Sequence, residues 1–264
     1  MNIFLRELKA NFRSLLIWAA IVVLFVVLGV SKFSAYYNNP DMLKLINDLP
    51  QAVRDVLNTQ SFNMTTVSGF FGIMFTYYAL LLGIAAAMWG SDIVSKEERD
   101  KTVEFALTMP VTRARLITGK ALAALVNCVL LLGITWGASL ISSASYQPDA
   151  AFFKFLALCM LALFFLQLIF LAAGILLGCA MKRYKLAVST AVFVLLGTYF
   201  LSIVITLNKN LDFLRFLSPF QYFDAAALLH TSSFDGIFII LSLVIVAACM
   251  VGAYLTYSRR DLYI

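Results

Sequence analysis

Residues 155–181 read FLALCMLALFFLQLIFLAAGILLGCAM and contain no Asp, Glu, Lys or Arg. The stretch is longer than the roughly 20 apolar residues that an α-helix needs to cross a lipid bilayer. A charged side chain at the bilayer centre would cost about 2.5 to 3.5 kcal/mol, so the absence of charge is as informative as the hydrophobicity. The stretch therefore predicts a membrane-spanning helix.

The same criterion finds five more uncharged runs, at residues 14–31, 56–91, 121–148, 186–208 and 236–258. The run at 56–91 is too long for one span and is rich in Asn, Thr and Ser from Asn58 to Thr66, so its helix is placed from Val67. The sequence thus predicts an all-α, polytopic integral membrane protein with one transmembrane domain over residues 1–264. Its six transmembrane helices are expected at about residues 15–32, 67–90, 116–143, 153–181, 186–207 and 234–257.

The composition excludes a water-soluble domain. Hydrophobic residues make up 62% of the chain and charged residues 13%, against roughly 45 to 50% and about 25% in soluble domains. Fourteen Lys and Arg residues lie on the side of the two termini and six on the other side, whereas the acidic residues divide seven and seven. This bias predicts cytoplasmic termini, and it explains the net charge of +6 without a nucleic-acid partner.

Three segments outside the spans have amphipathic patterns. The first, residues 1–13, mixes apolar and basic side chains: Ile3, Phe4, Leu8 and Phe12 with Arg6, Lys9 and Arg13. It predicts an N-terminal interfacial amphipathic helix with its basic residues at lipid phosphates, and an ordinary basic flank is the alternative. Residues 33–66 and 208–234 predict short membrane-associated helices on the outer face, with ordinary capping structure as the alternative.

The sequence contains no pattern for catalysis, a cofactor or a metal. A phosphate-binding loop needs a GxxxxGK[ST] run, whereas Gly119-Lys120 is followed by alanine and lacks the upstream glycine. His230 is the only histidine, and the four cysteines lie apart in apolar stretches. We therefore expect neither enzymatic activity nor a cofactor in this chain.

Small residues and amides inside the spans predict helix packing. Gly133 with Gly137, and Gly174 with Gly178, are GxxxG pairs that allow close backbone approach, either within the bundle or in a dimer interface. Asn127 and Gln167 are amides within the third and fourth spans, where hydrogen bonds between helices are the usual role.

The segment between the second and third spans, at residues 91–115, is the least typical loop of the chain. Its first part reads SDIVSKEERDKTVEFALTMPVTR over residues 91–113. Thr102 can cap a short helix that Pro110 ends, and Thr112 can cap the helix that follows. The short helix carries apolar side chains on the cytoplasmic side: Val103, Phe105, Ala106, Leu107 and Met109. These predict a protein partner on which the helix docks, and a loop folded against the inner leaflet is the alternative.

This loop resembles that of the membrane-spanning subunit of ABC-2 type ABC transporters, the permease subunits of bacterial exporters. In that family the loop reads approximately E-x-x-x-G-T-x-E-x-x-L-x-x-P-V-x-R. The matching residues here are Glu97, Thr102, Glu104, Leu107, Pro110, Val111 and Arg113. Lys101 departs from the pattern, because many members have glycine at this position.

The resemblance implies a permease of the bacterial cell membrane that forms half of a translocation pathway. A second permease subunit, either a copy or a related chain, would supply the other half, and two ATP-binding subunits would bind the cytoplasmic face. Their expected contacts on this chain are Glu97, Thr102, Val103, Glu104, Phe105, Leu107, Pro110 and Arg113. Residues 91–115 would then be the cytoplasmic coupling loop.

Two other functions are compatible with six spans. An ion-coupled secondary carrier or a channel is one, although the uncharged runs that define the spans contain no Asp, Glu, His, Lys or Arg for an ion relay. A non-transporting membrane scaffold is the other. Within the transporter hypothesis, the uncharged helices favour amphipathic or lipid-like cargo over a small ion.

Overall fold

The computed structural model of the chain describes residues 3–37, 39, 41, 44, 45, 48, 50–56, 62–99, 112–181 and 184–259. Within these residues every regular element is a helix. Six are long and apolar enough to cross a membrane: α1 (Ile3–Tyr36), α4 (Val67–Arg99), α6 (Arg113–Ser143), α7 (Ala150–Ala180), α8 (Tyr184–Leu207) and α10 (Gly236–Ser258). The prediction of an all-α polytopic membrane protein with six transmembrane helices is confirmed.

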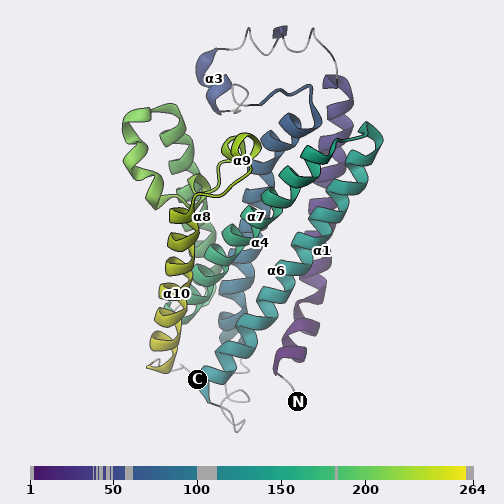
Figure 1. Cartoon of the computed structure of the whole chain (residues 1–264). Coiled ribbons are helices and arrows are strands. Elements are labelled where there is room, and N and C mark those ends of the chain that lie inside the picture. The colour runs from purple at the N-terminus through teal and green to yellow at the C-terminus, as the bar shows by residue number, and fades with distance from the viewer. Residues whose placement is uncertain are drawn as a thin grey trace.

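The two ends of the bundle differ (Figure 1). The start of α1, the end of α4, the start of α6 and the end of α10 lie together, and we call this the termini end. The short helices lie toward the opposite end: α3 (Gln51–Val56), η1 (Ala144–Tyr146), η2 (Lys209–Leu217), η3 (Pro219–Gln221) and α9 (Ala225–Thr231). Short helices were predicted from residues 33–66 and 208–234, and α3, η2, η3 and α9 lie in those segments.

The helices α4 and α7 form the centre of the bundle. In each, 67% of the most apolar window is buried, against 17% in α1 and α10. Their backbones approach closely at three glycines, because a Cβ at Gly174 would lie 2.6 Å from the carbonyl oxygen of Ala87 and one at Gly178 would lie 2.7 Å from that of Ser91. Gly90 faces the backbone of Leu171 from the other side of the same crossing. Lipid tails are as apolar as leucine, so it is this close packing, rather than the hydrophobic effect, that holds α4 against α7.

The N-terminal segment differs from the expectation. Residues 1–13 were expected to form a separate interfacial helix, whereas from Ile3 onward they are the first turns of α1, which continues to Tyr36. No proline interrupts this stretch, and Ile3, Phe4 and Leu8 pack against the core of the bundle. The apolar face that suggested a helix lying on lipid is thus partly covered by protein.

The two GxxxG pairs provide a matched test of packing. Gly174→Ala is expected to destabilise the fold by about 1 to 3 kcal/mol, because the added methyl group must separate two backbones. Gly133→Ala is expected to leave stability unchanged or to raise it by up to about 1 kcal/mol, since nothing lies within 4 Å of a Cβ at this position and alanine is the better helix former. Unfolding in mixed micelles measures both, and equal losses in the two variants would contradict the crossing described here.

Candidate functional site

A buried ion pair joins α1 to the last turns of α4 at the termini end. Glu7 is 1% exposed, and its carboxylate pairs with the ammonium group of Lys96, whose side chain is 12% exposed. Arg6 adds a longer contact, with Nη2 at 3.3 Å from Oε1 of Glu7. Because Lys96 lies three residues before the end of α4, the pair fixes this helix just ahead of residues 100–111.

Lys120 ties α6 to the same part of α4. Its side chain is 1% exposed, and Nζ donates a hydrogen bond to the carbonyl oxygen of Ile93 at 2.8 Å. The sequence analysis assigned Lys120 no structural contact. The long aliphatic stem of lysine lets the charged group reach a backbone acceptor while the stem packs among apolar side chains.

The start of α6 is also fixed to the end of α10. Thr112 is the N-cap of α6 and accepts a hydrogen bond from the backbone N–H of Arg115 at 3.3 Å, which confirms the predicted cap. Arg113 donates from Nη1 to the carbonyl oxygens of Tyr257 and Ser258, each at 3.2 Å. A guanidinium at the carboxyl end of a helix also stabilises the negative end of the helix dipole.

The expected ATPase contacts are only partly visible. Arg113 is described above, and Glu97 lies in the last turn of α4, whereas Thr102, Val103, Glu104, Phe105, Leu107 and Pro110 lie outside the described residues. The end of α4 and the start of α6, which flank this loop, both lie at the termini end (Figure 1).

The predicted packing residues have different surroundings. Gly174 and Gly178 lie against α4, whereas nothing lies within 4 Å of a Cβ built at Gly133 or Gly137. The amides of Asn127 and Gln167 are 1% and 0% exposed, in accord with interior positions. In the described part of the chain, however, the amide nitrogens of both and the amide oxygen of Gln167 have no hydrogen-bond partner.

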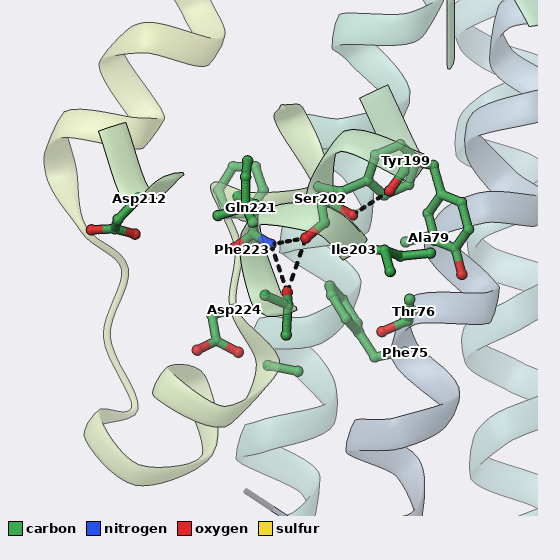
Figure 2. A pocket seen from close by; sticks show the side chains of 14 residues that line it. Phe75, Thr76, Ala79, Tyr199, Ser202, Ile203, Asp212, Gln221, Phe223 and Asp224 are labelled. Carbon is green, nitrogen blue, oxygen red and sulfur yellow. Dashed lines mark hydrogen bonds between the residues drawn. The ribbon is translucent and has the colours of Figure 1, made fainter. Parts of the chain in front are cut away.

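A cavity toward the opposite end lies between α4, α8 and the segments before α10 (Figure 2). Its volume is about 480 Å³. Its walls combine aromatic and apolar side chains with polar ones: Phe75, Thr76 and Ala79 of α4, Tyr199, Ser202, Ile203, Ile205 and Thr206 of α8, and Asp212, Phe220, Gln221, Phe223, Asp224 and Ala225. An aromatic wall with hydroxyl, amide and carboxylate groups suits an amphipathic ligand.

Hydrogen bonds hold one wall of this cavity in place. Gln221 donates from Nε2 to the carbonyl oxygen of Ser202 at 2.9 Å and to Oγ1 of Thr206 at 3.1 Å, which ties η3 to α8 (Figure 2). Asp224 caps α9 by accepting from the backbone N–H of Ala226 at 2.9 Å. Nearby, burial raises the pKa of the Tyr222 phenol, which donates to the carbonyl oxygen of Phe216. The sequence analysis missed the cavity, although polar Ser202 and Thr206 within a span were a signal for it.

Comparison with known families gives a match over nearly the whole chain. The family model described as ABC-2 family transporter protein matches residues 1–262 of the chain. No curated protein matches it. The match covers all six spans and agrees with the resemblance of the loop between α4 and α6. The chain therefore belongs to the ABC-2 family of transporter proteins, the membrane-spanning permease components of ABC transporters.

Proposed function

We propose that this chain is the permease subunit of an ATP-driven exporter and forms half of its translocation pathway. Separate ATP-binding subunits, two per complex, dock at the termini end, and a second permease subunit completes the pathway. The loop between α4 and α6 is the coupling segment that receives force from the ATP-binding subunits.

The path of α4 is the observation that best supports this proposal. This one helix runs from Val67 to Arg99, so its end leads directly into the coupling loop. Near its other end, Phe75, Thr76 and Ala79 line the cavity of Figure 2. At about 1.5 Å per residue an uninterrupted helix carries a displacement over tens of ångströms. A movement at the loop can thus displace the cavity wall.

The orientation follows from the distribution of basic residues. Fourteen of the 20 Lys and Arg residues belong to the side of the termini, and by the positive-inside rule this bias supports a cytoplasmic position for that side. The termini end then faces the compartment that holds ATP, and the cavity of Figure 2 lies toward the outer side. Its aromatic and polar lining favours amphipathic cargo.

The test is to measure ATP hydrolysis with and without a partner. Purified chain alone should hydrolyse no more ATP than a mock preparation, because its sequence has no phosphate-binding loop. Adding a partner ATP-binding subunit, identified by its co-purification with the chain, should give hydrolysis in the joint complex, and a hydrolysis-deficient form of that subunit is the control. Hydrolysis by the isolated chain, or substrate uptake driven by an ion gradient alone, would contradict the proposal.

A further inference from the structure

A second groove lies at the termini end, between α1 and α4. Its volume is about 570 Å³. The part nearer the helix ends is polar, with Asn11, Arg13 and Ser14 of α1 and Asp92 and Lys96 of α4. The lining residues of α1 recur every three or four positions, so they form one face of the helix.

The polar part contains hydrogen-bond donors that the protein leaves unused. Asn11 is 8% exposed, and within the described residues its Nδ2 has no hydrogen-bond partner. A buried amide N–H without an acceptor is unfavourable, so an acceptor from outside the chain fits here. Arg13 likewise makes no ion pair or hydrogen bond in the described part of the chain. The next residue, Ser14, also lines the groove, and its hydroxyl accepts a hydrogen bond from Nε1 of Trp89 at 2.9 Å.

Arg13, which has no ion pair in the described part of the chain, favours an anion as that acceptor. Arg13 and Lys96 are the basic lining residues and Asp92 is the acidic one, although Lys96 also pairs with Glu7. A guanidinium beside amide and hydroxyl donors is a typical setting for a phosphate group.

The inner part of the groove is apolar. Going away from the helix ends, the lining changes to Ile17, Trp18 and Ile21 of α1 and Met88 of α4, and Ile17 is 62% exposed. A water-soluble phosphate would leave these side chains uncovered, whereas acyl chains would cover them. Tryptophan beside a polar-to-apolar boundary is also characteristic of the membrane interface.

We propose that this groove binds an anionic phospholipid from the leaflet at the termini end. The phosphate accepts hydrogen bonds from Asn11 and Arg13 and interacts with the charge of Lys96. The acyl chains lie along Ile17, Ile21 and Met88. Because Lys96 is close to the coupling loop, occupancy of the groove would link the lipid composition of that leaflet to the position of α4.

The test is to count lipids bound to the delipidated full chain by native mass spectrometry, after exposure to phosphatidylglycerol or to phosphatidylcholine with the same acyl chains. The chain should retain phosphatidylglycerol in preference. Arg13→Gln should lower the bound fraction about fivefold, the effect of one basic residue at a lipid surface. Lys9→Gln is the matched control, because Lys9 is an exposed lysine on the same helix that does not line the groove. It should leave the bound fraction unchanged.

Asn11→Leu separates lipid binding from folding. It should lower phosphatidylglycerol retention while the thermal unfolding midpoint stays equal or rises, since the variant removes an unpaired buried amide. Equal retention of the two lipids, or equal losses in Arg13→Gln and Lys9→Gln, would overturn the proposal. So would displacement of the lipid by inorganic phosphate, which would indicate a free-phosphate site. Disulfide formation between two copies of an Ile17→Cys variant would instead identify the groove as a protein interface.

Discussion

Replacing Val103 with aspartate is expected to abolish co-purification of the ATP-binding subunit and, with it, transport. On the proposed function, Val103 and Leu107 lie one turn apart on the coupling helix and fill an apolar groove of the partner. Truncating a buried anchor at an interface centre costs about 2 kcal/mol or more, and inserting a charge there costs further desolvation free energy. Leu107→Ala is therefore expected to have the same effect.

Two companion variants make this result interpretable. Val103→Leu keeps the apolar character and should retain the partner. Glu104→Lys changes a charge at the rim, which affects association more weakly, so it should reduce transport while part of the complex still assembles. Pull-down yield and transport are measured together, at equal expression in the membrane. If the Val103→Asp chain captures its partner at wild-type yield and transports, the partner docks elsewhere, and residues 182–185 become the next segment to test.

Removing the carboxylate of Glu7 is the change with the second largest expected effect. Glu7→Ala leaves the ammonium group of Lys96 buried without its ion-pair partner, and the loss of one partner of a buried pair costs about 3 kcal/mol or more. The variant should unfold at clearly lower denaturant concentration in micelles. The end of α4 should also become accessible, so a single cysteine at Ser95, which is 3% exposed, should react faster with a soluble maleimide.

Arg6→Gln is the matched control for Glu7→Ala. Arg6 contacts the same carboxylate at 3.3 Å, but its side chain is 34% exposed, so the loss should be a small fraction of that for Glu7→Ala. The exchanged pair Glu7→Lys with Lys96→Glu should recover part of the stability. If the stability losses of the two single exchanges simply add up in the double variant, the ion pair does not hold α1 to α4.

The membrane spans were predictable because each depends on a local property. A run without charges, such as residues 155–181, is read directly from the sequence, and the free-energy cost of burying charge in lipid fixes where it ends. The N-cap at Thr112 was predictable for the same reason, since a cap acts within a few residues.

The contacts of the termini end were not predictable from such local signals. Glu7, Lys96 and Lys120 each read as solvated charges flanking a span. Their burial depends on α1, α4 and α6 meeting at one end, which only the tertiary structure determines. The two GxxxG pairs show the same limit, because one motif lies against a neighbouring backbone and the other faces open space in a single subunit. The cavity of Figure 2 likewise has walls from α8 and from η3. The position of η3 against α8 cannot be predicted from the hydrophobic pattern of either segment.

The close crossing at Gly90, Gly174 and Gly178 has a mechanical consequence. At these glycines the backbones of α4 and α7 are in contact, with no flexible side chains between them. The two helices are therefore expected to move as one rigid unit. Bending one helix alone would break this contact, so α4 and α7 would tilt or slide together. Relative movement within the molecule would then occur at the side-chain contacts between the α4–α7 unit and the other long helices, α1, α6, α8 and α10. A displacement of α4 at Arg99 would therefore also displace Phe75, which lines the cavity. The four neighbouring helices would determine its direction.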